Sequence, residues 1–169
     1  MTVGGWQRPE PLALGTGGRA AGPVYLAAAI AYFVAVEALG VTFDATPLLV
    51  AIAMMAAGAV RGRFPGAALP LASWGIAVLL VRHGPLADER EAPAFIVALA
   101  IGIALLVLLK GTRLEIDLAT AVMGTAAVMA FGGVAFYLGF AYGMFLDAWF
   151  WALVLAAAGV LHLVLARPG

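Results

Sequence analysis

Residues 148–166 read AWFWALVLAAAGVLHLVLA, a stretch without Asp, Glu, Lys or Arg. A transmembrane helix needs about 20 consecutive, predominantly apolar residues to cross the hydrocarbon core of a bilayer. A strand of a membrane β-barrel would instead alternate apolar and polar residues over about ten positions. The continuous apolar run therefore predicts a helix that crosses a membrane.

Five further apolar runs precede this one, separated by short polar or Pro/Gly segments. The six expected spans are residues 23–43, 46–60, 66–81, 93–109, 118–138 and 148–166. The second is short and allows either a complete span or a re-entrant half-helix. In hydrocarbon every backbone N–H and C=O group needs an internal partner, which a continuous helix supplies. The expected fold is an all-α integral membrane bundle of about six transmembrane helices, with residues 23–167 as the membrane domain.

The composition independently indicates a membrane protein. Of the 169 residues, 65% are hydrophobic and 11% are charged, whereas soluble domains carry about 45–50% apolar and about 25% charged residues. Because most residues of a small domain touch its surface, a chain this apolar must be partly solvated by lipid. The nine basic and nine acidic residues balance, so net charge does not favour a nucleic-acid partner. The absence of cysteine excludes disulfides and thiolate chemistry.

The loops between the expected spans differ in positive charge. In a six-span topology the side of the N-terminus carries Arg8, Arg19, Arg61, Arg63, Lys110, Arg113 and Arg167, and the opposite side carries Arg82 and Arg90. Short cytoplasmic loops carry the excess of Lys and Arg. We therefore expect both termini to be cytoplasmic, with residues 1–22 as a retained polar arm rather than a cleaved signal peptide. The expected location is a cell membrane, namely a prokaryotic inner membrane.

Glu37 lies inside the first expected span, about six residues from its outer end, or roughly 9 Å at 1.5 Å per residue. A carboxylate at that depth costs about 2.5–3.5 kcal/mol or more unless it is protonated, paired or hydrated. Two interpretations remain open. Glu37 is either a proton or cation site for transport, or a structural residue that reaches the interface or pairs with Arg82 at the end of the third span.

Two further ionisable residues are candidates for the same transport function. His162, in the last span, is either a proton-relay residue or a hydrogen-bonded structural imidazole. The second histidine, His83, is expected on the opposite side, so no two-His metal or haem site can form. Asp147 precedes the last span and is interpreted first as a helix N-cap. We expect no metal, cofactor or catalytic residue, because the chain has no G-x-S-x-G, HExxH or phosphate-binding Gly loop.

Small residues recur at four-residue spacing, which lets helices approach closely. The examples are Ala27, Ala31 and Ala35 in the first span and Gly139 and Gly143 in and after the fifth. Packing within the chain is favoured over homo-oligomerisation. Three aromatic side chains with polar tips, Tyr32, Trp74 and Tyr137, are candidates to line a narrow solute path, although such residues also fill bundle interiors.

The leading functional hypothesis is therefore a permease or channel for a small solute or ion, and not an enzyme. The alternative is a non-catalytic subunit that packs against partner membrane proteins. The expected partners are the lipid bilayer and either a second copy or other membrane subunits, without nucleic acid. A wettable path between helices would favour transport, whereas a dry interior and a bare Ala/Gly face would favour the subunit.

Overall fold

The computed structural model of the chain describes residues 17–62, 65–84, 91–109, 118–142 and 147–165. Within these ranges all regular secondary structure is helical, which confirms the all-α prediction for this part of the chain. The elements are α1 (Gly17–Glu37), η1 (Phe43–Ala45), α2 (Thr46–Arg61), α3 (Ala68–His83), α4 (Glu91–Leu109), α5 (Leu118–Tyr142) and α6 (Ala148–Leu165).

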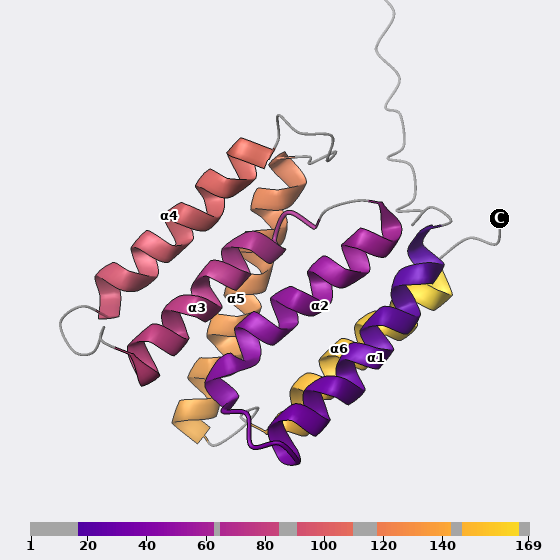
Figure 1. Cartoon of the computed structure of the whole chain (residues 1–169), viewed down its shortest axis with the longest axis horizontal. Helices are drawn as coiled ribbons and strands as arrows, with labels where there is room; N and C mark the ends of the chain where they lie inside the picture. Colours follow the sequence, from indigo (N-terminus) through magenta and orange to yellow (C-terminus); the bar gives the residue numbers. More distant parts are fainter. Residues whose placement is uncertain (1–16, 63–64, 85–90, 110–117, 143–146, 166–169) are drawn as a thin grey trace, which may run out of the picture.

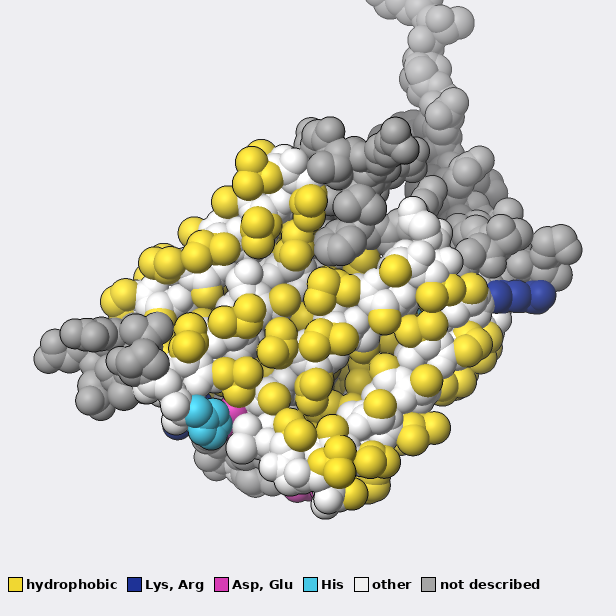
Figure 2. Space-filling model, in the orientation of Figure 1, with side chains coloured by type: hydrophobic (Ala, Val, Ile, Leu, Met, Phe, Trp, Pro, Cys, Tyr) yellow, Lys and Arg dark blue, Asp and Glu magenta, His cyan; other side chains and the backbone are white. Residues whose placement is uncertain are grey.

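Three segments among the described residues are long and apolar enough to cross a membrane: Arg19–Glu37, Phe43–Arg61 and Ala148–Leu165. Ala68–His83 and Pro93–Leu109 are also apolar but shorter. Figure 2 shows hydrophobic side chains spread over the face in view, with charged ones toward its edges. Soluble monomers rarely expose contiguous apolar patches larger than a few hundred Å². The apolar helices and this surface are consistent with association with a membrane.

The helices pack in a simple order (Figure 1). α1 lies against both α6 and α2, α2 packs on α3, and α3 packs on α4. α5 lies behind α3, which is its principal contact among the described residues. The closest pair of helices is therefore α1 and α6, and α1 also contacts α2.

Glycines lie at the closest approaches between helices. A Cβ on Gly75 of α3 would lie 2.6 Å from the backbone nitrogen of Leu48 in α2, and one on Gly102 of α4 would lie 2.6 Å from Cα of Pro70 in α3. A Cβ on Gly159 of α6 would lie 2.9 Å from the carbonyl oxygen of Gly22 in α1. The absence of a side chain lets the backbones approach to these distances, as in other membrane helix pairs.

The first helix differs from its expected span. α1 has 21 residues, but it begins and ends six residues earlier than the expected run 23–43. The helix ends at Glu37, and the chain then turns through Gly40, whose φ of +68° favours glycine. After that turn the short helix η1 leads directly into α2, so the segment before Asp44 is not part of α1.

The end of α2 follows from its sequence. Arg61 is the last residue of the helix, and Gly62 adopts a left-handed conformation with φ of +66°. The N–H of Gly62 donates to the carbonyl groups of Ala59 and Gly58, as in a glycine cap of a helix C-terminus. This cap positions Arg61, whose positive charge interacts favourably with the helix dipole there.

Candidate functional site

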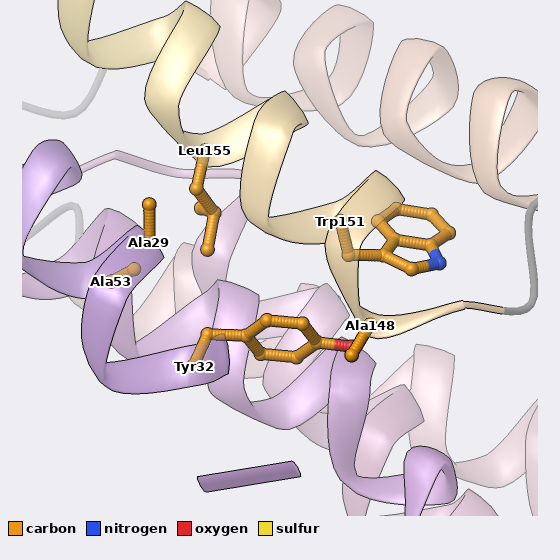
Figure 3. Close-up of a cluster of buried hydrophobic side chains, with 6 residues drawn as sticks. All are labelled: Ala29, Tyr32, Ala53, Ala148, Trp151 and Leu155. Carbon is orange, nitrogen blue, oxygen red and sulfur yellow. The ribbon is translucent and has the colours of Figure 1, made fainter. Parts of the chain in front are cut away.

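The largest buried cluster lies between α1, α2 and α6. We call it the α1–α2–α6 core; it consists of Ala29, Tyr32, Ala53, Ala148, Trp151 and Leu155. Figure 3 shows the Tyr32 ring extending from α1 toward Ala148 at the start of α6, while Ala29, Ala53 and Leu155 lie together on another side. Aliphatic and aromatic carbon fills most of this interior, so its few polar atoms are informative.

A buried hydrogen-bond chain ties α1 to the start of α2. Tyr32 and Thr46 are 3% and 1% exposed, and their hydroxyl oxygens lie 2.8 Å apart. The Thr46 hydroxyl donates to the carbonyl oxygen of Phe43 at 2.6 Å. Because a hydroxyl has one proton to give, Tyr32 must be the donor to Thr46. Among the described residues, no buried side-chain nitrogen or oxygen lacks a hydrogen-bond partner.

A second polar group, the Arg61 cluster, consists of Tyr25, Arg61 and His162. Nδ1 of His162 lies 2.8 Å from the carbonyl oxygen of Ala158, and Nε2 lies 3.4 Å from Nη1 of Arg61. A carbonyl only accepts, so Nδ1 carries the proton and Nε2 accepts from the guanidinium. The Tyr25 and His162 ring centroids are 5.1 Å apart. His162 thus has a hydrogen-bonded environment, and its role in proton transfer stays a prediction.

At the other end of α2, the Asp44 cluster consists of Thr42, Asp44, Arg82 and His83. Asp44 Oδ2 lies 3.3 Å from Nε2 of His83, and Oδ1 lies 3.9 Å from Nε of Arg82. The Thr42 hydroxyl lies 3.4 Å from the same His83 nitrogen. These contacts join η1 to the end of α3. Because the side chains of Arg82 and His83 are half-exposed, their contacts with Asp44 contribute little to stability.

The structure changes the setting of Glu37. It is the exposed last residue of α1, not a residue one and a half turns inside a helix. Glu37 is thus the last residue of the candidate span Arg19–Glu37 rather than an interior one, because the turn at Gly40 ends the helix early. Arg82, the partner expected for Glu37, pairs instead with Asp44.

The other candidate site residues are dispersed. Asp147 directly precedes α6, and its Oδ2 accepts a hydrogen bond of 3.2 Å from Nε1 of Trp149. Trp74 stacks on Phe95 at 4.6 Å and so joins α3 to α4. Tyr137 is 67% exposed on α5. Of the three expected path-lining aromatics, Tyr32 lies in the α1–α2–α6 core and the other two lie elsewhere.

The small residues chosen from spacing are not those that line the α1–α6 contact. Ala27 and Ala31 are exposed and Ala35 is half-buried, whereas Gly22 and Ala29 are buried. Gly139 belongs to α5, and Gly143 lies outside the described residues. Alanine is so frequent in α1 that a four-residue spacing of small residues occurs on several faces of the helix and does not identify the packed one. The sequence signal that was missed is the pair of glycines, Gly22 and Gly159.

No protein-family model, curated protein or solved structure matches this chain. Its function must therefore be inferred from its own geometry. The described residues contain no group of three or more His, Cys, Asp or Glu side chains able to hold a metal ion.

Two of the polar groups lie along the same buried core, an arrangement that the sequence did not indicate. Tyr25 packs against the α1–α2–α6 core from one end, and Tyr32 lies within it toward the other. The two tyrosines are separated by roughly 10 Å along α1, given a rise of 1.5 Å per residue. Ala29, Ala53 and Leu155 occupy the interval. The Arg61 cluster and the Tyr32–Thr46 pair are thus arranged along the same three helices with a short apolar layer between them.

Proposed function

We propose that the chain crosses the membrane six times with both termini cytoplasmic, and that it is a permease or channel for a small solute or ion. In this proposal the solute moves between α1, α2 and α6. Support comes from the arrangement of two polar groups along the same helices. The Arg61 cluster lies on one side of the apolar layer, and the Tyr32–Thr46 pair lies on the other. That single observation carries the proposal.

The apolar layer is the element that would control passage. Hydrophobic constrictions close a pore by excluding water, and a polar group placed in one lets water enter. Ala29 and Ala53 are small, so Leu155 supplies most of the apolar volume of the layer. It is 3% exposed. In this proposal the closed state corresponds to Leu155 packed in the same cluster as the two alanines.

The test is flux through Leu155→Ser in liposomes, with protons, small carboxylates and alkali cations as solutes. We expect the variant to raise flux of the transported solute about tenfold over the wild type, which corresponds to about 1.4 kcal/mol off the barrier. Leu153→Ser is the matched control, because Leu153 lies on the same helix and is 57% exposed. Equal flux through both variants, or flux no higher than in empty vesicles, would refute the proposal.

The topology has a separate test that uses the natural absence of cysteine. Single cysteines replace Arg19 at the start of α1, Thr42 before η1, Leu109 at the end of α4 and Tyr142 at the end of α5. With both termini cytoplasmic, a membrane-impermeant maleimide added to intact cells should label positions 42 and 142. It should label positions 19 and 109 only after lysis. Any other pattern contradicts the six-span arrangement.

A second candidate function, assembly with another membrane protein, is favoured by α5. Met123 and Val134 on this helix are 71% and 59% exposed, and among the described residues no atom outside the local backbone of α5 lies within 4 Å of a Cβ built on Gly133. Its principal described contact is with α3. A transmembrane helix of a partner would pack on this face. Crosslinking from Ala130→Cys in native membranes should capture one defined partner, and a product that contains this chain alone would contradict the hypothesis.

A further inference from the structure

Arg61 differs from Arg82 and His83 in its side-chain contact, because its described partner is a neutral group rather than a carboxylate. Arg82 and His83 lie beside the carboxylate of Asp44. Arg61 is half-buried, and its described hydrogen bond goes to Nε2 of His162. Asp44 is at the opposite end of α2, roughly 25 Å away at 1.5 Å per residue. A partly desolvated guanidinium without a neighbouring carboxylate among the described residues favours an anionic ligand.

Within the described ranges, the contact with His162 occupies only part of the Arg61 guanidinium. Arginine has five N–H donors in a planar fork, and the contact with His162 uses one of them, on Nη1. The remaining donors form the edge that binds carboxylate and phosphate groups through two parallel hydrogen bonds. Tyr25 lies beside His162, with the two ring centroids 5.1 Å apart, which places this tyrosine in the same cluster as Arg61. A tyrosine hydroxyl can donate a hydrogen bond to an anion.

His162 acts through Arg61 rather than on the ligand. Its Nδ1–H is anchored on the carbonyl of Ala158, which fixes the plane of the ring, and its Nε2 then orients Nη1 of Arg61. The glycine cap at Gly62 holds the backbone of Arg61 at the end of α2. The guanidinium is thus held from both its backbone and its side chain, which lowers the entropy lost when a ligand binds.

We propose that Arg61 and Tyr25, positioned by His162, bind an oxyanion group, either carboxylate or phosphate, at this end of the α1–α2–α6 core. Two sources have this chemistry: a small soluble anion and the phosphate of a lipid headgroup. For a soluble anion, the inference rests on the proposed transport function and names its substrate class as small oxyanions. For a lipid, the same site anchors the end of α2 to the headgroup region.

Binding is measured on the full chain in a maltoside detergent, which contains no phosphate or carboxylate. The readout is the midpoint of thermal unfolding, followed by tryptophan fluorescence, because a ligand that binds the folded state raises it in a concentration-dependent manner. The probes are sodium phosphate, sodium acetate and phosphatidylglycerol. Sodium chloride at equal ionic strength controls for the salts, and uncharged diacylglycerol controls for the lipid. We expect a saturable rise with at least one oxyanion and none with either control.

The variants identify the residues. Arg61→Gln should weaken binding about 10- to 100-fold, since it removes charge-assisted hydrogen bonds. Arg61→Lys keeps the charge without the fork and should fall between Arg61→Gln and the wild type. Tyr25→Phe should weaken binding several-fold. Arg19→Gln is the matched control, because Arg19 is an exposed arginine on α1, and it should bind as the wild type does.

Each outcome decides the inference. An Arg61-dependent rise with phosphate or acetate supports a soluble oxyanion, and one with phosphatidylglycerol alone supports the lipid headgroup. No saturable rise with any probe, or equal weakening by Arg19→Gln, overturns the site. If Arg61→Gln fails to fold, the test relies on Arg61→Lys and Tyr25→Phe. Wild-type affinity for the oxyanion in both variants would overturn the proposed site. The readout is binding and not flux, so it is independent of the result with Leu155→Ser.

Discussion

Replacing Gly75 by alanine tests whether the contact between α2 and α3 depends on the absence of a side chain. A Cβ at position 75 would lie 2.6 Å from the backbone nitrogen, 2.8 Å from Cβ and 2.9 Å from Cα of Leu48. Ordinary van der Waals contact begins at 3.4 Å, so one helix must move by about 0.8 Å. Two of the three atoms belong to the backbone of α2, which means that no rotation of a side chain can relieve the overlap.

Extra atoms forced into a packed interior typically cost about 1–3 kcal/mol. For a chain of this length, 1 kcal/mol shifts the midpoint of thermal unfolding by about 2–4 °C. We therefore expect Gly75→Ala to lower the midpoint in detergent by roughly 2–12 °C. Circular dichroism at 222 nm is a suitable readout because the described regular structure is helical.

Gly133→Ala in α5 is the matched control. It makes the same chemical change in a helix, but in the described part of the chain nothing beyond the helix's own local backbone lies within 4 Å of the added Cβ. Alanine is a better helix former than glycine by about 1 kcal/mol, so the control should keep or raise the midpoint. A midpoint for Gly75→Ala equal to or above that of Gly133→Ala would refute the inferred close approach of α2 and α3.

Four further substitutions test the Tyr32–Thr46 hydrogen bond, the Asp44 cluster and the Gly62 cap, each by thermal unfolding in the same detergent. Thr46→Val leaves the buried Tyr32 hydroxyl without its acceptor and should lower the free energy of unfolding by about 1–3 kcal/mol. Tyr32→Phe removes the donor and should lower it by about 0.5–1.5 kcal/mol. A larger loss for Tyr32→Phe than for Thr46→Val would contradict the assigned direction of the hydrogen bond. Asp44→Asn should cost at most about 1 kcal/mol, because its contacts with His83 and Arg82 are solvent-accessible, and the loss should shrink at high salt. A loss that salt does not change would argue against this weak, screened pairing. Gly62→Ala places a side chain at a φ of +66° and should cost about 1–2 kcal/mol; an unchanged midpoint would mean that α2 does not need this cap.

The Asp44 cluster and the Arg61 cluster differ in how far the sequence predicts them. The Asp44 cluster joins residues around η1 to the end of α3, both of which border expected spans, so charged side chains were anticipated near there. In the Arg61 cluster, Arg61 and His162 are 101 positions apart. Their contact depends on α2 and α6 both packing against α1, and no local pattern encodes that arrangement.

The sequence alone determined that the described chain is helical and strongly apolar, because long runs without charge leave the backbone no other way to satisfy its hydrogen bonds in hydrocarbon. The end of α1 at Glu37 is set by a local turn at Gly40, and the apolar run 23–43 does not reveal where that turn ends the helix. Which face of each helix is buried was decided by the tertiary structure. In α1 and α6 apolar residues surround the helix on all sides, so hydrophobicity does not distinguish a face toward lipid from one toward another helix. Close packing makes that distinction, and it places Gly22 against Gly159 rather than joining the helices along Ala27 and Ala31.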